Sequence, residues 1–304
     1  MVRIEDRPID IRVSSIPTIY GEKIVLRILD RGAVVLDLNQ MGFEPKQLEL
    51  MRRAVNSPYG LVFLTGPTGS GKTTTLYAIL NEVKSSTKNI ITIEDPVEYK
   101  LEGINQVQLK PEIGLTFASA LRSFLRQDPD IMLVGEVRDL ETAQICIRSA
   151  LTGHLVFSTL HTNDAPSAVS RLVDIGIEPY LLAPSLLLIV AQRLIRKLCP
   201  DCKEAYEPTP EEQKNIKLKA ELIYKTKGCA KCNQLGYKGR TCIAEVMSIN
   251  EEIKTLVSQG AAFQKIRDAA KASGMQTLHE SAIRKAEEGI TSLEEALSIT
   301  IGTE

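Results

Sequence analysis

Short apolar runs alternate with amphipathic stretches over most of the chain, between about residues 38 and 198. The apolar runs are short enough for buried strands, and the stretches between them have helical periodicity. We expect strands at 61–64, 90–93, 131–134 and 155–159, and helices at 45–55, 74–80, 117–125 and 141–150. Strands that alternate with helices predict an α/β fold, in which helices flank a parallel sheet on both faces.

The N-terminal region follows a different pattern. Ile9, Ile11 and Val13 alternate with polar residues, and residues 24–29 resume this period of two after a break. Such alternation is typical of half-buried strands, so we expect a small antiparallel β piece within residues 1–37. Because the first strand begins almost at the first residue, we also expect a larger N-terminal region to precede it.

The C-terminal region, residues 243–304, is expected to be helical. Amphipathic runs at 250–257, 261–272 and 279–286 have the spacing of helices that bury one face. A capping-box pattern that begins at Ser292 predicts the start of a last helix. His279 has no partner at metal-ligand spacing, so we interpret it as a structural residue.

Composition narrows the class of protein. The 304 residues are 43% hydrophobic and 25% charged, as in a soluble globular protein of about two domains. The formal net charge of -1 gives no basic surface, so we expect no nucleic-acid partner. The N-terminus lacks the apolar segment of a signal peptide. The longest apolar run, Tyr180–Val190, contains Pro184 and is too short to cross a bilayer, so we expect a buried helix there.

The strand expected at 61–64 leads into a phosphate-loop pattern, G-x-x-x-x-G-K-[ST], and a helix follows it. Glycines let the backbone N–H groups point at phosphate oxygens, and the helix N-terminus adds positive potential. We expect Lys72 to reach the β- and γ-phosphates of ATP and the Thr73 hydroxyl to bind Mg²⁺. The expected nucleotide contacts of the loop are Gly66, Pro67, Thr68, Gly69, Ser70, Gly71, Lys72, Thr73 and Thr74.

Three further polar residues, Glu94, Glu136 and His161, directly follow expected strands. Ligands bind beyond the carboxyl ends of parallel strands, so we expect these side chains to converge on the phosphate loop. Phosphoryl transfer needs charge neutralisation and a group that orients the attacking water. Glu136 is our candidate for orienting that water. His161 is our candidate for a hydrogen bond to the γ-phosphate, with His154 as a weaker one. Taken singly, the same residues could be helix caps or surface groups.

The remaining magnesium ligand stays open at this point. An ordinary phosphate-loop ATPase has an aspartate on Mg²⁺ just before the catalytic glutamate, and here that position is Gly135. The carboxylates that compete to hold Mg²⁺ through water are Glu94, Asp95 and Glu98.

Six cysteines in a chain with an ATP-binding motif favour a metal over disulfides. Two C-x-x-C pairs are separated by 26 residues, which leaves room for a charged helical insert at 209–225. Four thiolates suit a tetrahedral Zn²⁺ with no open position, which is a structural site. We expect a zinc-binding region at 199–242, although unpaired or redox cysteines are the alternative. The expected ligands are Cys199, Cys202, Cys229 and Cys232. The remaining two cysteines, expected to be packed small residues, are Cys146 and Cys242.

Several stretches resemble the secretion-superfamily ATPases, which drive type IV pilus assembly and type II secretion. They are the phosphate loop, IEDPVEY (93–99), LRQDPDIMLVGEVRD (125–139) and GHLVFSTLHTNDAPSAVSRL (153–172). The resemblance runs from about residue 9 to the C-terminus. It implies a RecA-like core, here 38–198, joined by a flexible linker to a PAS-like domain whose end matches residues 1–37.

The resemblance also implies roles for single residues. Residues 93–99 match the "Asp box" of that family, Glu136 its catalytic glutamate and His161 its "His box", and Gly135 is usual there. Arg12 and Arg27 match two arginines that reach the nucleotide, whereas from the residues alone they are solvated strand arginines. The tetracysteine resembles assembly and secretion members, while retraction members lack it.

The function implied is that of a hexameric motor ATPase, which hydrolyses ATP to power extraction and polymerisation of pilin. It would act at the cytoplasmic face of the inner membrane, peripheral to it and through a platform protein, with no transmembrane segment. A type II secretion ATPase that drives pseudopilus assembly is the main alternative. A nucleic-acid translocase is disfavoured by the net charge. A non-hydrolysing, nucleotide-sensing scaffold has support only from Gly135.

Overall fold

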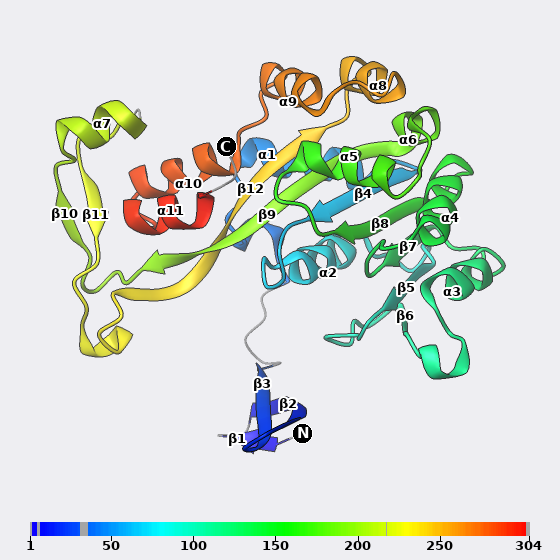
Figure 1. The fold of residues 1–304 in the computed structure, drawn as a ribbon, viewed down its shortest axis with the longest axis horizontal. Helices are drawn as coiled ribbons and strands as arrows, with labels where there is room; N and C mark the ends of the chain where they lie inside the picture. The colour runs from blue at the N-terminus through cyan, green and yellow to red at the C-terminus, as the bar shows by residue number, and fades with distance from the viewer. Residues whose placement is uncertain (1, 5–6, 31–35, 217, 302–304) are drawn as a thin grey trace.

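A seven-stranded sheet lies at the centre of the structure, a computed structural model that describes residues 2–4, 7–30, 36–216 and 218–301 (Figure 1). The order across the sheet is β12-β9-β4-β8-β7-β5-β6, and only β12 runs antiparallel to its neighbour. The strands are β4 (Gly60–Thr65), β5 (Ile90–Glu94), β6 (Asn105–Gln108), β7 (Ile131–Val134), β8 (Leu155–Leu160), β9 (Leu186–Leu198) and β12 (Tyr237–Ser248). This mixed α/β architecture confirms the predicted fold class.

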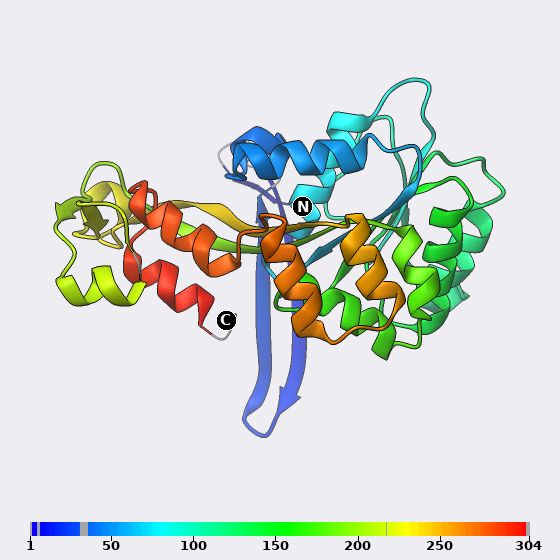
Figure 2. The same cartoon turned by 90° about the horizontal axis from the view of Figure 1, so that it is seen from above.

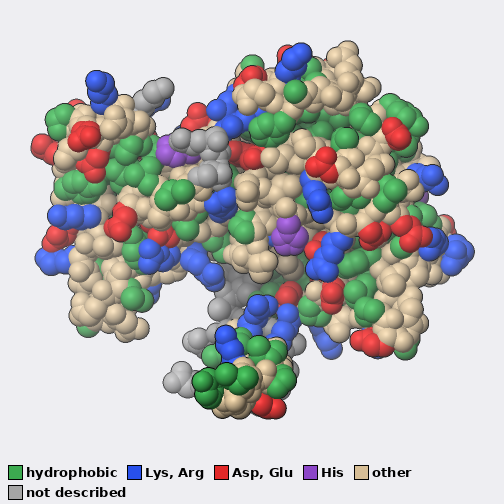
Figure 3. All heavy atoms as spheres, in the orientation of Figure 1, with side chains coloured by type: hydrophobic (Ala, Val, Ile, Leu, Met, Phe, Trp, Pro, Cys, Tyr) green, Lys and Arg blue, Asp and Glu red, His purple; other side chains and the backbone are tan. Residues whose placement is uncertain are grey.

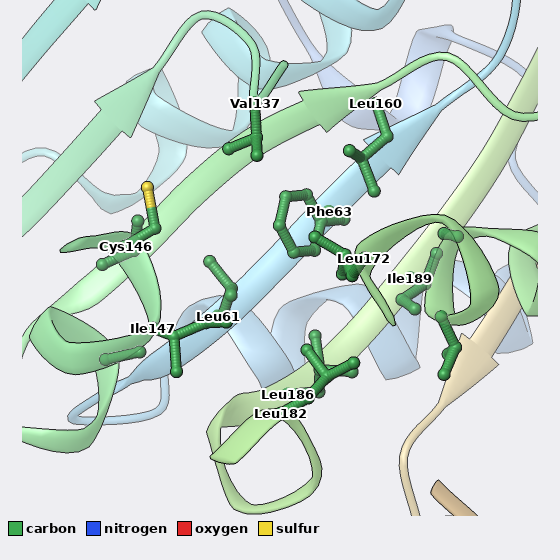
Figure 4. Close-up of a cluster of buried hydrophobic side chains, with 14 of the residues drawn as sticks. Leu61, Phe63, Val137, Cys146, Ile147, Leu160, Leu172, Leu182, Leu186 and Ile189 are labelled. Carbon is green, nitrogen blue, oxygen red and sulfur yellow. The ribbon is translucent and has the colours of Figure 1, made fainter. Parts of the chain in front are cut away.

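Helices cover both faces of this sheet, as its fully buried strands β4, β5, β7 and β8 require. Successive side chains of a strand point to opposite faces, so Leu61 and Phe63 of β4 enter one core while Val62 and Leu64 enter the other. Figure 4 shows the first of these cores, where Leu61 and Phe63 lie among side chains from β9 and the neighbouring helices. Its helices are α3 (Phe117–Phe124), α4 (Leu140–Leu151), α5 (Ala165–Asp174), α6 (Pro179–Ser185), α8 (Glu251–Ser258) and α9 (Phe263–Ala272). The second core is closed by α1 (Pro45–Val55) and α2 (Lys72–Val83).

A smaller lobe forms beyond the sheet, at the end of the long ribbon made by β9 and β12 (Figure 2). Ile195 and Ile243, which lie on this ribbon, pack in a third core with helices α10 (Leu278–Glu287) and α11 (Leu293–Thr300). The expected boundary after residue 242 falls inside β12, so this strand belongs to both neighbouring regions. The remaining elements of the lobe are β10 (Glu204–Tyr206), α7 (Pro210–Ile216), β11 (Ile223–Lys225) and the short 3-10 helix η4 (Ala230–Cys232).

The N-terminal residues form a separate antiparallel sheet of three strands, β1 (Val2–Ile4), β2 (Arg7–Thr18) and β3 (Gly21–Asp30). Its β2–β3 hairpin projects from the body of the molecule (Figure 2). Apolar side chains are exposed along this hairpin, as the green spheres at the lower edge of Figure 3 show. They include Val13, Ile16, Ile19, Tyr20, Ile24, Leu26 and Ile28. Two short 3-10 helices complete the described elements, η2 (Leu38–Gln40) and η3 (Pro111–Ile113).

The expectation of one buried helix over Tyr180–Val190 is wrong. Helix α6 ends at Ser185, and β9 begins at Leu186 and pairs with β4 in the middle of the sheet. A short apolar run suits a buried helix and a buried strand equally, and only the pairing with β4 decides between them. The insert at 209–225 is likewise helical only in α7, since its end forms β11 and pairs with β10. Within the described ranges, no helix combines the length and the apolar character needed to cross a bilayer.

A buried carboxylate joins the C-terminal helices to the core. Glu245 on β12 is 1% exposed, and its two oxygens accept the N–H groups of Ala165 and Leu278, each at 3.0 Å. These residues begin α5 and α10, so one negative charge lies at two helix N-termini, where it is stabilised. Burial nevertheless raises the pKa of Glu245.

We therefore expect Glu245→Gln to lower the free energy of unfolding by about 1–3 kcal/mol, because the amide NH₂ would face an N–H donor. Because the pKa is raised in the folded chain, the folded state holds this proton more tightly than the unfolded state does. Wild-type stability should therefore fall as the pH rises through that pKa, and the variant should lack this slope. Urea unfolding at several pH values measures both effects. Glu112→Gln, in the exposed 3-10 helix η3, is the control; equal losses in the two variants would contradict the assignment.

Candidate functional site

The phosphate-loop residues connect the end of β4 to the start of α2, as expected. Gly66, Gly69 and Gly71 have φ angles of 141°, 81° and 90°, in the region that favours glycine. A Cβ atom on Gly66 would lie 2.4 Å from the Gln192 carbonyl oxygen, so no other residue fits there. The Ser70 hydroxyl is buried and, within the described part of the chain, has no hydrogen-bond partner. The loop therefore has the backbone that a phosphate cradle requires.

Lys72 lies across this loop and is 9% exposed. Its ammonium donates hydrogen bonds to the carbonyls of Gly66 and Pro67, at 2.7 and 3.1 Å. Burial lowers the pKa of Lys72, and the nearby negative charge of Glu136 opposes that shift. Thr73, the next residue, is exposed to the cavity described below.

A cavity of about 690 Å³ brings the predicted residues together. Its lining combines the phosphate loop with side chains that follow β5, β7 and β8, as the rule for parallel sheets predicts. Arg27 of the N-terminal sheet lies on the same cavity. Its charged or titratable lining residues are Arg27, Lys72, Glu94, Asp95, Glu98, Glu136, Arg138, His161 and Arg240, with Tyr77 and Tyr99.

Glu136 lies at the centre of this group, with 12% of its side chain exposed. It forms an ion pair with Arg138, and the Nε2 atom of His161 lies 3.4 Å from a carboxylate oxygen. Glu136 follows β7 and His161 follows β8, so the two side chains meet because these strands lie side by side in the sheet. His154 precedes β8, at its opposite end, and contacts the Ser149 carbonyl at 3.1 Å. The weaker assignment of His154 to the phosphates is therefore wrong.

Gly135 occupies a position where a side chain has little room. Its N–H donates to the Ile93 carbonyl at 2.8 Å, and a Cβ atom would lie 3.3 Å from that oxygen and 3.4 Å from the Glu94 Cα. Close approach of β5 to the end of β7 thus leaves little room for a side chain at the position before Glu136.

The three carboxylates considered for magnesium differ in their surroundings. Glu94 is 4% exposed, and its oxygens already accept hydrogen bonds from Tyr77, Thr92 and Gln106. Glu98 accepts from both terminal nitrogens of Arg12, at 2.7 and 3.3 Å. Asp95 is exposed, and no hydrogen bond or ion pair joins its carboxylate to any residue that the structure describes. Asp95 is therefore the carboxylate with most freedom to bind another group.

The two N-terminal arginines both lie at or beside this cavity within one chain. Arg27 lines the cavity, and Arg12 pairs with Glu98 in the loop after β5. Their side chains come from adjacent strands at paired positions of the hairpin.

Sequence reasoning missed three residues of this cavity. Tyr77 of α2 is fully buried, donates to Glu94 and accepts the Glu98 N–H at 3.3 Å, and its burial and the Glu94 contact raise its pKa. Arg138 follows Glu136 by two residues. In the sequence, Arg240 stands out only as a basic residue near the cysteines. Strand β12 places it on the cavity.

The four paired cysteines form a compact cluster, far along the chain from the cavity. Their sulfur atoms all lie within 4.8 Å of one another, with Sγ–Sγ distances of 3.7 Å for Cys229–Cys232, 3.8 Å for Cys202–Cys232 and 3.9 Å for Cys199–Cys229. A tetrahedral zinc site with Zn–S bonds of about 2.3 Å requires sulfur atoms about 3.8 Å apart. The N–H groups of Cys229 and Gly236 each donate to the Cys232 sulfur at 3.2 Å. The donor set therefore fits zinc.

The other two cysteines are packed, as predicted. Cys146 and Cys242 are 0% and 1% exposed, and burial raises the pKa of each thiol to about 12. None of the six cysteines is joined to another by a disulfide.

Comparison with known proteins agrees with this arrangement. The family model described as "Type II/IV secretion system protein" matches residues 1–298. Type II secretion system protein HxcR of Pseudomonas aeruginosa is 52% identical over 299 residues, which are 98% of this chain and 61% of that protein. Type IV pilus assembly ATPase PilB of Myxococcus xanthus is 50% identical over 301 residues, which are 97% of this chain and 53% of that protein.

The crystal structure of the pilus retraction motor PilT with bound ADP has a TM-score of 0.70 at 30% identity, and the match covers 96% of this chain and 74% of that one. The chain spans 61% and 53% of the two curated relatives named above. The fold, the phosphate loop and the family match over residues 1–298 all indicate the same family. The chain belongs to the type II/IV secretion system protein family.

Proposed function

We propose that this chain hydrolyses ATP as the motor of a pilus or secretion machine. The observation that carries the proposal is the one cavity that joins the phosphate loop to Glu136, His161 and Arg27. Its size suits a nucleotide, since ligand cavities measure roughly 300–1,000 Å³. A ligand in the loop would also supply the partner that the buried Ser70 hydroxyl lacks among the described residues. The homologous motor PilT binds ADP.

In this proposal the loop N–H groups and Lys72 bind the β- and γ-phosphates. Glu136 orients the attacking water, and His161, held beside it, donates to the γ-phosphate. The exposed hydroxyl of Thr73 and the carboxylate of Asp95 fit Mg²⁺, because both are oxygen donors on the cavity with freedom to bind. When bound, Mg²⁺ neutralises charge that develops on the phosphates. Glu94 accepts the Tyr77 hydroxyl, which in turn accepts the Glu98 N–H, so these contacts hold the loop after β5 in place. Glu98 positions Arg12.

We further propose a structural Zn²⁺ held by Cys199, Cys202, Cys229 and Cys232. The sulfur spacing supports it, and four thiolates leave no open coordination position for chemistry. The residues surrounding it in sequence are basic, which offsets the negative charge of such a site.

We propose type IV pilus assembly as the work of this motor, carried out as a homo-hexamer at the cytoplasmic face of the inner membrane with a platform protein. The relative PilB, named an assembly ATPase, supports this role at 50% identity. The P. aeruginosa relative supports type II secretion at 52% identity, so pseudopilus assembly is the second candidate. A non-hydrolysing scaffold has support only from Gly135, where a side chain has little room.

Phosphate release by mixed variants tests the active site and its arginines together. Because Arg27 lines the cavity of its own chain, we expect Arg12→Ala with Arg27→Ala to lose activity by about 10³-fold or more. Mixing this protein with Glu136→Gln, under conditions of subunit exchange, should restore no activity, since neither chain has a complete site.

Exchange between differently labelled chains shows that mixing has occurred. Arg53→Ala, on the exposed side of α1, is the control and should keep wild-type turnover. Recovered phosphate release would assign the arginines to a neighbouring subunit. Wild-type protein that releases no phosphate from ATP and Mg²⁺ would contradict the proposed hydrolysis itself.

A further inference from the structure

Gln192 on β9 contacts the phosphate loop through both ends of its amide. It is 2% exposed. Its Nε2 donates to the Ser70 carbonyl at 2.9 Å, and its Oε1 accepts the Thr75 hydroxyl at 2.8 Å. Ser70 lies within the loop and Thr75 in the first turn of α2. One side chain of a neighbouring strand thus holds the loop and the helix that follows it.

The bond to Ser70 fixes the direction of a backbone donor. In a trans peptide the C=O and the next N–H point in opposite directions. Holding the Ser70 carbonyl toward Gln192 therefore turns the Gly71 N–H away from β9. A phosphate cradle needs its N–H groups to converge on the ligand, and an amide turned the other way would present a carbonyl to it.

The backbone around Gln192 is packed closely against the same loop. A Cβ atom on Gly66 would lie 2.4 Å from the Gln192 carbonyl oxygen, and one on Gly71 would lie 2.8 Å from Nε2. Strand β9 pairs directly with β4, which leads into the loop, with Ala191 opposite Thr65. Gln192 therefore contacts both the first and the last part of the loop.

We propose that Gln192 is a positioning residue, which sets the phosphate loop in its nucleotide-binding shape and couples it to β9. The proposal rests on the nucleotide binding proposed above. Gln192 itself touches no phosphate; it acts through the Ser70 peptide and the first turn of α2.

Titration with a fluorescent ADP analogue and Mg²⁺ tests this role. Gln192→Met keeps the length of the side chain and removes both hydrogen bonds, and we expect about tenfold weaker ADP binding. Gln192→Glu keeps the acceptor for Thr75 but lacks the donor to Ser70, so we expect it to bind as weakly as Gln192→Met. Because Thr75 acts through the same amide, adding Thr75→Val to Gln192→Met should cause less further loss than Thr75→Val alone.

The matched control is Gln47→Met. Gln47 is also a buried glutamine with two hydrogen bonds, to the Glu44 N–H at 3.0 Å and the Ala244 carbonyl at 2.9 Å, but it lies outside the nucleotide cavity. Each of the two glutamine-to-methionine variants should have a lower melting temperature than wild type, because each loses two buried hydrogen bonds. Gln47→Met should nevertheless leave ADP affinity unchanged. ADP affinity that is the same in wild type, Gln192→Met and Gln192→Glu would overturn the role of Gln192. A wild-type protein that binds no ADP would instead refute the proposed function.

Discussion

Glu136→Gln is expected to reduce ATP turnover by about 10²–10⁴-fold, the usual contribution of a general base, while ADP and ATP still bind. The amide keeps the size of the side chain but cannot take a proton from water. Glu136 is held between Arg138 and His161 at the cavity, and the phosphate loop does not depend on it for its hydrogen bonds. Phosphate release under saturating ATP, together with a separate binding titration, measures both properties.

Glu102→Gln, in an exposed turn, is the matched control for the loss of one carboxylate and should turn over ATP like wild type. Lys72→Ala should lose affinity for ATP as well as turnover, unlike Glu136→Gln, because it removes the positive charge that binds the phosphates. Turnover that persists in Glu136→Gln would show that another group orients the water.

Removing two cysteine ligands is expected to have the largest effect on stability. Cys229→Ser with Cys232→Ser should abolish zinc binding and lower the melting temperature, because zinc sites of this type contribute about 10–16 kcal/mol in isolated peptides. Ile195 of β9 packs in the third core with α10 and α11, and the N–H of Leu198, which precedes Cys199, donates to the Ile290 carbonyl at 2.8 Å. Loss of the cluster should therefore spread into the third core. Metal analysis of purified protein and thermal unfolding with and without a strong chelator measure the effect.

Cys146→Ala serves as the control, because this buried cysteine lies in the first core of the central sheet and outside the cysteine cluster. It should keep one zinc per chain, with only the modest loss of stability that a smaller side chain causes. A wild-type protein with no bound metal, or one whose stability ignores the chelator, would show that the cysteines have another role.

The sequence predicts most of the central sheet because its strands carry strong local patterns. Each of the strands β4, β5, β7 and β8 is a short apolar run followed by a polar residue or a glycine. Strand β9 was misassigned at its start because Leu186–Val190 continues an apolar run begun in α6, and periodicity cannot divide such a run. Short β6 and the lobe strands β10 and β11 depend on pairing with residues far along the chain.

Some residues of the candidate site can be predicted from local sequence, and others cannot. The phosphate-loop motif and the residues at strand ends can be predicted, since the common direction of parallel strands brings them to one edge of the sheet. Arg240 could not be predicted, because only the long β12 carries it back to the cavity. The choice among Glu94, Asp95 and Glu98 also needed the fold, since it depends on which carboxylates already accept hydrogen bonds from Tyr77 and Arg12.

The β9–β12 ribbon can act as a lever arm. Gln192 touches the phosphate loop from the middle of β9, and Cys199 of the cluster follows the last residue of that strand, about 20 Å further along at the usual rise of an extended strand. Cross-strand hydrogen bonds stiffen the ribbon over this length, except at the irregularity between Tyr237 and Arg240. By this geometry a tilt of about 5° at Gln192 would displace the end of β9 beside the cysteine cluster by about 2 Å.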